Sequence, residues 1–537
     1  MKILRSITVF SIAAAVLTGC ASSSDNSSQS VSEVSVEEIT QSSGEQLKLP
    51  VLSIETKNKS KDVLDFITVP VALHVSEAIT TWDPTYEIPP EPYYEECTVS
   101  LKDSDGTPLF DNADAEVKVR GNWTTVYEKK PLRIKFTEKQ SMLGLNDGAE
   151  QKNWLLLAEY KDASMLRNEA SLYASRELLG RHGLFAADCN LVRVEINGDF
   201  FGVYLLSDMQ QVSSARVNIA EPEKDYKGTD IGYFLEYDGY FYNEDALHQF
   251  ALDLADNAPL TPYDGNGGSG RTIQCLPTSP DDPIEEVGIS IKSAVRSQEQ
   301  HDFIENYINS VYRIMYEAAY NDKAYVFDKD YKKISETKDI TPQQAVENVV
   351  DVQSLVDMYI ISDLTCDADI YWSSFFMDVD MSAEGSKKLT FEAPWDFDSG
   401  LGNKDRCIDG TGFYACNIVP DVNGGPQGNG FYETANPWLM VLAYEDWYQD
   451  MIRDTWTEVY DDGVFKNTIQ LVRNESSQYK DEFKRNYDKW NNIIENDDFA
   501  AELSEPAAEC KNEAEAAEFL AQWLEKRVEF LNSQWHK

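Results

Sequence analysis

Residues 391–402, FEAPWDFDSGLG, lie between a β-rich first part of the chain and a mostly helical last part. Apolar residues lead into two carboxylates, Asp396 and Asp398, and the chain then turns at two glycines. Many segments before this stretch, especially in the first part of the chain, alternate apolar and polar residues, as strands do. Residues 430–537 instead place apolar residues on one helical face. This order predicts an α+β fold, with a β-rich N-terminal part followed by a mostly helical C-terminal part.

The composition of the 537-residue chain is that of a globular protein, since 42% of its residues are hydrophobic and 12% are aromatic. Its formal net charge of −46 would repel a phosphate backbone, which argues against nucleic-acid partners. Carboxylates are usually exposed, so any single aspartate is by default a surface charge. Taken alone, Asp396 and Asp398 could simply satisfy backbone amides of the turn.

The first 20 residues have the pattern of a bacterial lipoprotein signal peptide. Lys2 and Arg5 precede a short apolar run, and the sequence Leu-Thr-Gly-Cys ends at Cys20. The run is shorter than the ~20 residues that a membrane-spanning helix needs. We expect cleavage before Cys20 and lipid attachment to its thiol, which would anchor an extracytoplasmic protein to the bacterial cell membrane. The alternative is an ordinary signal peptide with an incidental cysteine.

Residues 21–48 are Ser-rich and acidic and have no periodic apolar face, so they are predicted to be a flexible linker. We expect a β-rich region over 49–110 and the main domain over 111–537. Within that domain, a Gly-, Pro- and Asp-rich insertion at about 240–287 separates two predicted partner strands, GYFLEYD and GISIKS. Helices are predicted over residues 162–183, 298–320, 342–365 and most of 430–537.

The cysteines and histidines argue against several chemistries. None of the eight cysteines lies in a CxxC pair, so a zinc ribbon has no support. The five histidines show neither metal-ligand spacing nor a nearby HExxH or GxSxG, which argues against zinc hydrolases and Ser-His-Asp esterases. A glycosidase needs only two carboxylates and stays open. Cys407 and Cys416 could close a loop after the acidic stretch, although the sequence does not establish this pairing.

Three groups of residues together fit phosphoryl transfer. Asp369 opens the segment DIYWSS, and Asp396 and Asp398 follow the predicted strand KLTFEAPW. The reaction needs a carboxylate near the acceptor hydroxyl, carboxylates that hold Mg²⁺, and a cation over the phosphates. At a strand-to-turn corner, the two alternate aspartates would point to the same side. The cation could come from RGNWTTVYEKKPLRIKF, which contains Arg120, Lys130, Arg133 and Lys135.

Six ordered motifs resemble the CotH kinase family of secreted, spore-coat-type kinases. They are VRGNWTTVYEKKPLRIKF, NWLLLAEYKDASMLRNEASLYASREL, VEINGDFFGVYLLSDMQQV, GYFLEYD, GISIKS and APWDFDSGLGN. The resemblance runs from about 110 to 403, and the Trp-rich C-terminal helix is also similar. It implies a strongly diverged protein-kinase-like fold that uses ATP and a divalent metal, Mg²⁺ or Mn²⁺, to phosphorylate Ser or Thr of exported proteins.

The resemblance also assigns roles by position. Asp369 occupies the position of the catalytic aspartate, Asp396 that of the metal-binding aspartate, and Asp398 is a second metal ligand. Ser374 stands where kinases carry a metal-binding Asn, and a serine hydroxyl is a weaker ligand for that metal position. Asp367 rivals Asp369 on local sequence, but the spacing to Ser374 favours Asp369.

Four basic residues are candidates for binding the nucleotide phosphates: Arg120, Lys130, Lys135 and Arg167. The sequence does not choose between the two lysines. Arg167 and Asn168 lie on a helix that resembles the kinase regulatory helix, where hydrogen bonds to a neighbouring loop are as well expected as ligand contact. Because ATP is scarce outside the cell, the alternative function is a non-catalytic surface scaffold or binding module for coat or polysaccharide attachment. A two-carboxylate glycosidase is the third possibility.

Overall fold

The computed structural model describes the following residues: 48–60, 64, 80, 85, 94–121, 123–263, 272–276, 287–367, 369–404, 408, 410–417, 419–420, 433–434, 436–491 and 503–537. The predicted signal peptide with Cys20 and nearly all of the linker lie outside the described residues, as do parts of 49–110 and of the insertion. Cys407 lies outside them as well, so its pairing with Cys416 stays a prediction.

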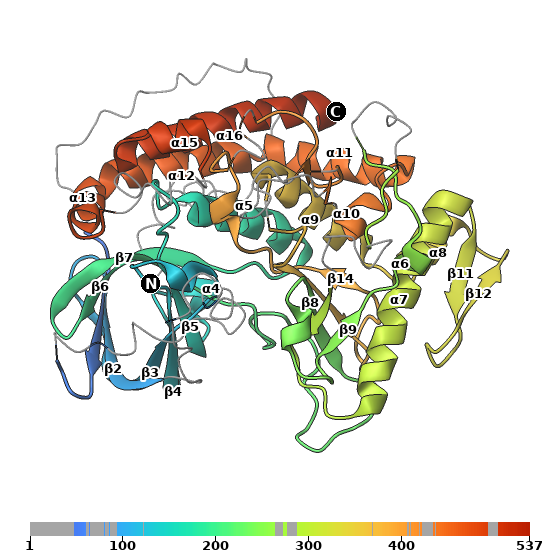
Figure 1. Ribbon diagram of the computed structural model, residues 1–537, viewed down its shortest axis with the longest axis horizontal. Helices are drawn as coiled ribbons and strands as arrows, with labels where there is room; N and C mark the ends of the chain where they lie inside the picture. The colour runs from blue at the N-terminus through green and yellow to red at the C-terminus, as the bar shows by residue number, and fades with distance from the viewer. Residues whose placement is uncertain are drawn as a thin grey trace, which may run out of the picture.

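Seven strands close into a barrel in the N-terminal part of the chain, in the order β1-β2-β3-β4-β5-β7-β6. Neighbours pair antiparallel, except that β1 pairs parallel with β6 and so closes the barrel. Figure 1 shows the barrel at the lower left. The strands are β1 Val51–Thr56, β2 Glu95–Lys102, β3 Pro108–Val119, β4 Leu132–Gln140, β5 Gln151–Leu157, β6 Cys189–Ile196 and β7 Asp199–Ser207.

The alternation of side chains along the strands separates the inside of the barrel from its outside. Trp154 of β5 points inward and is fully buried in the barrel core. Its neighbour Leu155 belongs to the main core, which it shares with Leu172 of the helix Arg167–Leu179 between β5 and β6. The predicted hairpin between β6 and β7 is confirmed, and Asn197 and Gly198 both take positive φ at its turn.

A second sheet has five strands in the order β14-β13-β8-β10-β9 and lies to the right in Figure 1. The predicted pairing of GYFLEYD with GISIKS is confirmed, since β8 and β10 pair antiparallel. Its strands are β8 Gly232–Asp238, β9 Gln249–Ala251, β10 Gly288–Ile291, β13 Phe375–Asp380 and β14 Thr390–Phe391. Two ribbons complete the described strands, β11 Ala324–Phe327 with β12 Ile334–Thr337, and β15 Val419–Pro420 with β16 Glu433–Thr434.

Helices dominate the last part of the described chain. In Figure 1, α12 and α16 run along the top, and α5 and α9 lie in the middle of the view. The longer helices are α5 Arg167–Leu179, α7 Gln298–Asn321, α9 Val352–Thr365, α11 Asp446–Asp461, α12 Val464–Gln478, α13 Lys480–Lys489 and α16 Glu513–Trp535. The shorter ones are α4 Leu145–Gly148, α6 Leu254–Asn257, α8 Pro342–Glu347, α10 Pro437–Met440 and α15 Glu505–Glu509. The prediction of a β-rich part followed by a helical part is confirmed.

Two predicted helices differ in the structure. The helix expected from Asp162 begins only at Arg167, because residues 162–166 form a turn in which Met165 has positive φ. The Asp162 carboxylate still accepts the N–H groups of Leu166 and Arg167, so it caps the helix from a distance. The helix expected over 342–365 is split into α8 and α9, because Val350 leaves the helix to bridge Leu389.

A buried ion pair ties α16 to α9. Nη2 of Arg527 lies 2.6 Å from Oδ1 of Asp363, and its Nε donates to the Asp363 carbonyl at 2.8 Å. Both side chains are 0% exposed. Because α9 leads directly into the segment that carries Asp367 and Asp369, this pair helps to set the position of those aspartates. Among the described residues, no helix combines the length and apolarity needed to cross a membrane.

Candidate active site

The acidic loop, residues 395–403, follows β14 and carries Asp396 and Asp398. Asp396 has φ 71°, a left-handed conformation that is costly for a residue with a Cβ. Phe397–Ser399 then forms the short helix η4. The expectation that the two aspartates continue the alternation of a strand is therefore wrong, because the chain leaves the extended conformation at Asp396.

Neighbouring side chains hold this loop in place. The Asn168 side-chain carbonyl accepts the N–H of Phe397 at 2.9 Å. The Asn403 amide donates to the backbone carbonyls of Asp398, at 2.7 Å, and of Lys161, at 3.1 Å. The Lys161 ammonium donates to the Ser399 hydroxyl at 3.0 Å. Helix α5 and the segment that follows β5 thus both bind the loop, and these contacts hold its left-handed turn.

Three predicted carboxylates and one predicted cation come together around this loop. Burial and the negative charges of Asp369 and Asp398 raise the pKa of Asp396 to about 8, while the cations Arg120 and Lys161 oppose that rise. Burial also raises the pKa of Asp398, which Lys161 lowers and Asp369 raises. The charges of Asp369, Asp398, Arg120 and Lys161 therefore act on Asp396, and those of Asp369 and Lys161 act on Asp398. The structure brings together Asp369, Asp396, Asp398 and Arg120, and it adds Lys161.

The surroundings of the two rival aspartates differ. Asp367 is only 2% exposed, and its carboxylate accepts the N–H of Asp369 at 3.0 Å. Burial, followed by the charge of Asp369, raises the pKa of Asp367 well above its ordinary value. Asp369 is only half-buried and lies in a tight turn, where its carbonyl accepts the N–H of Trp372 at 2.7 Å. Of the two aspartates, Asp369 is the more exposed.

Glu159 is a further carboxyl at this centre that the sequence analysis missed. It is 5% exposed, and the Asn168 amide donates to both of its oxygens at 3.1 Å. Burial raises its pKa well above the ordinary value, and the charges of Asp162 and Asp398 add to this effect. The buried carboxyl groups of the centre thus extend from the acidic loop to the segment that follows β5.

The two lysines proposed for phosphate binding have contacts elsewhere. The Lys130 ammonium donates to the Thr125 carbonyl at 2.7 Å and is partly buried. The Lys135 ammonium lies 3.5 Å from a Glu116 oxygen, and both side chains are largely exposed on the barrel. Neither lysine is among the main charges that shift the pKa values of Asp396 and Asp398.

Arg167 contacts other residues through its side chain, and Ser374 does so through its backbone N–H. Arg167 is buried at the start of α5, where its guanidinium forms an ion pair with Asp162 and lies over the ring of Phe519. Ser374 has positive φ, and its N–H donates to the Glu236 carboxylate at 2.9 Å. These contacts give both residues a role in holding the structure around the aspartates.

The residues missed from the sequence are Glu159, Lys161 and Asn403. The first two lie in the motif NWLLLAEYKDASMLRN, which resembles the family as a whole, whereas the basic candidates for the phosphates lie mainly between Arg120 and Lys135. The signal that could have found Lys161 is its place shortly after the buried end of β5, next to the Asp162 cap. Asn403 follows the glycines of the acidic loop and had no local signal.

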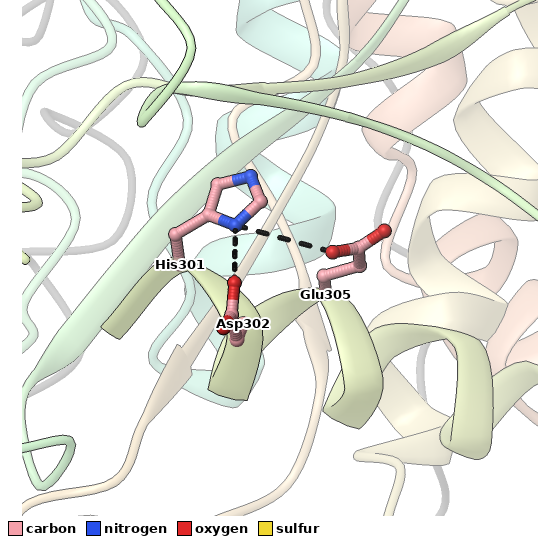
Figure 2. Close-up of side chains that lie close together, drawn as sticks. All are labelled: His301, Asp302 and Glu305. Atoms are coloured by element: carbon pink, nitrogen blue, oxygen red, sulfur yellow. Dashed lines mark hydrogen bonds and ion pairs between the residues drawn. The ribbon is translucent and has the colours of Figure 1, made fainter. Parts of the chain in front are cut away.

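A second group of possible ligands lies on α7. His301, Asp302 and Glu305 have ligand atoms within 4.8 Å of one another, and among the residues that the structure describes no other such trio is found. Figure 2 shows the imidazole above the two carboxylates. Nε2 of His301 lies 2.9 Å from the Gln249 carbonyl, and the Gln298 amide contacts both His301 Nδ1, at 3.2 Å, and Asp302, at 2.7 Å. These contacts account for the cluster without an ion.

The family model described as "CotH kinase protein" matches residues 117–531, most of the chain. The chain therefore belongs to the CotH kinase family, as the ordered motifs predicted. The matched segment contains all the residues gathered around the acidic loop. Family membership indicates a kinase-like function. None of the curated proteins compared with the chain matches it.

Proposed function

We propose that the protein is an ATP- and divalent-metal-dependent kinase that phosphorylates Ser or Thr hydroxyls of exported or cell-surface proteins. In this proposal the barrel is the N-terminal lobe of a strongly diverged kinase-like fold, and the second sheet with the helices is the C-terminal lobe. The observation that carries the proposal is the convergence of Asp369, Asp396 and Asp398 with two cations, Arg120 and Lys161.

The charges of this centre fit a divalent metal. Together with Asp367 and Glu159, the three aspartates outnumber the nearby cations. Repulsion by neighbouring carboxylates contributes to the raised pKa values of Asp367, Glu159, Asp396 and Asp398. A bound divalent cation would relieve this repulsion. Carboxylate oxygens are the ligands that Mg²⁺ and Mn²⁺ prefer. Asp396 and Asp398 are the residues that would hold the metal, and a metal there would neutralise charge on the transferred phosphoryl group.

The remaining roles follow from accessibility and charge. Asp369, the more accessible aspartate, would orient the acceptor hydroxyl and accept its proton as the oxygen bonds to the γ-phosphorus and ADP leaves. Arg120 would contact phosphate oxygens through its planar guanidinium. Lys161, between the acidic loop and β5, would stabilise the negative charge of the nucleotide. The contacts of Lys130, Lys135 and Arg167 support a structural role for them, and Ser374 would be at most a weak metal ligand.

One experiment tests the proposed reaction. The purified protein would be incubated with labelled ATP, Mn²⁺ or Mg²⁺, and exported proteins as acceptors. We expect label transfer by the wild type and by Asp330→Asn, an exposed control between β11 and β12, and losses of at least ~100-fold in Asp369→Asn and Asp396→Asn. Equal label in all four proteins, or none together with no nucleotide binding, would overturn the proposal. The latter result would favour a surface scaffold, and sugar release without ATP would favour a glycosidase.

The proposal includes location outside the cytoplasm through a lipid on Cys20. The support is the signal-peptide pattern with its Leu-Thr-Gly-Cys ending. The wild type should incorporate labelled fatty acid and partition with membranes, whereas Cys20→Ala should do neither. Incorporation of the label into Cys20→Ala would contradict the anchor.

A further inference from the structure

Asn168 connects three separate parts of the molecule. It lies in the first turn of α5 and is 7% exposed. Its side-chain oxygen accepts the N–H of Phe397 in the acidic loop at 2.9 Å. Its side-chain nitrogen donates to both oxygens of Glu159, beyond the end of β5, at 3.1 Å. One amide therefore links the helix, the barrel and the acidic loop.

The orientation of this amide follows from its partners. The Phe397 N–H can only donate, so the Asn168 oxygen must face it. The nitrogen then faces Glu159, whose two oxygens accept its hydrogens. The bond to Phe397 is made at the peptide directly after Asp396, the residue in the costly left-handed conformation. Without the Asn168 oxygen, the turn that aims Asp396 and Asp398 would lose its hydrogen bond from α5.

We infer that Asn168 is a positioning residue for the acidic loop, and that Glu159 acts by orienting the Asn168 amide. The position of α5 then determines how well Asp396 and Asp398 bind a metal. The inference rests on the proposed function only in assuming that Asp396 is a metal ligand. It requires neither ATP nor an acceptor protein, so metal binding can test it separately.

Exchanging the hydrogen-bond donor and acceptor between Asn168 and Glu159 tests the inference. Asn168→Asp keeps an oxygen for the Phe397 N–H but removes the amide nitrogen that donates to both Glu159 oxygens. Glu159→Gln alone keeps an acceptor oxygen for the Asn168 amide. In the double variant Asn168→Asp with Glu159→Gln, the Gln amide donates to the new carboxylate, so the original connection is restored with donor and acceptor exchanged.

The measurement is Mn²⁺ affinity by calorimetry at pH 8, with thermal unfolding in EDTA for every variant. We expect Asn168→Asp to weaken binding by about 10- to 100-fold, the range typical of residues that orient metal ligands. Glu159→Gln should have a smaller effect, and the double variant should recover most of the loss. The matched control is Asn306→Asp, since the Asn306 amide donates to a backbone carbonyl on another element, that of Lys332 at 3.3 Å.

The possible results distinguish a positioning role of Asn168 from direct metal binding by Glu159 and from the absence of a metal site. Wild-type affinity in Asn168→Asp would overturn the positioning role. Loss of binding in Glu159→Gln without recovery in the double variant would show that Glu159 binds the metal directly, and would also overturn the inference. Equal Mn²⁺ binding by the wild type and Asp396→Asn would refute the metal site of the proposed function. Loss of binding in Asp396→Asn combined with wild-type affinity in Asn168→Asp would refute this inference alone.

Discussion

Replacing Asp396 with Asn should stabilise the metal-free protein at pH 8, although it removes a proposed metal ligand. In the folded protein, burial and the charges of Asp369 and Asp398 raise the pKa of Asp396 from 3.8 to about 8. The fold therefore binds this proton more tightly than the unfolded chain does. The stability contributed by the protonated group is fully present below about pH 4 and is lost as pH rises towards 8.

The size of the effect follows from the shift in pKa. Each pKa unit corresponds to about 1.36 kcal/mol, so the whole shift of Asp396 corresponds to about 6 kcal/mol. The side chain is only partly buried, and screening by water reduces this figure. We expect Asp396→Asn to raise the free energy of unfolding at pH 8 by about 2 to 3 kcal/mol, or a few degrees in Tm. At pH 4, where the native group is protonated, the two proteins should be equally stable.

The assay is thermal unfolding in EDTA between pH 4 and 9, with Asp330→Asn as the exposed control. Added Mn²⁺ should raise the Tm of the wild type and of the control but leave Asp396→Asn unchanged, because only a protein that binds the metal gains stability from it. A lower Tm for Asp396→Asn than for the wild type at pH 8 in EDTA would refute the charge argument. A shift with Mn²⁺ that is equal in all three proteins would refute the metal site.

Three further predictions follow. Burial raises the pKa of Glu392, beside Asp378, to about 7, so the free energy of unfolding should also fall as pH rises from about 4.5 to 7. Glu392→Gln should flatten this part of the plot of Tm against pH. An unchanged plot would contradict the raised pKa of Glu392. Arg527→Met leaves the Asp363 carboxylate buried without its partner, so it should lower the free energy of unfolding by about 3 to 5 kcal/mol, as measured by urea unfolding. Wild-type stability in this variant would show that the ion pair is dispensable. Lys161→Met should shift Mn²⁺ binding to higher pH, because Lys161 lowers the pKa of Asp396 and the metal binds the deprotonated carboxylate. Calorimetry over a range of pH measures this shift. An unshifted profile would argue against the effect of Lys161 on Asp396.

The strands and hairpins were predictable because their signals are local. The hairpin at Asn197 and Gly198 needs only two residues that tolerate positive φ between alternating strands, and the structure has it. The start of α5 was placed too early, because Asp162 caps the helix across a turn that contains Met165. Such a cap leaves the same sequence signal as an adjacent one, so only the folded backbone distinguishes them.

The order of strands and helices and the CotH kinase family were determined by the sequence, and so was the choice of Asp369 and Asp396 as candidate site residues, since these depend on periodicity and ordered motifs. The tertiary structure decided which cations face the aspartates. Lys161 reaches Ser399 across 238 positions of the chain, while Lys135, in the favoured motif, points to the barrel surface. It also decided that Asp396 begins a left-handed turn held by Asn168. The physical reason is that proximity between distant side chains depends on how whole elements pack, and no local pattern records that packing.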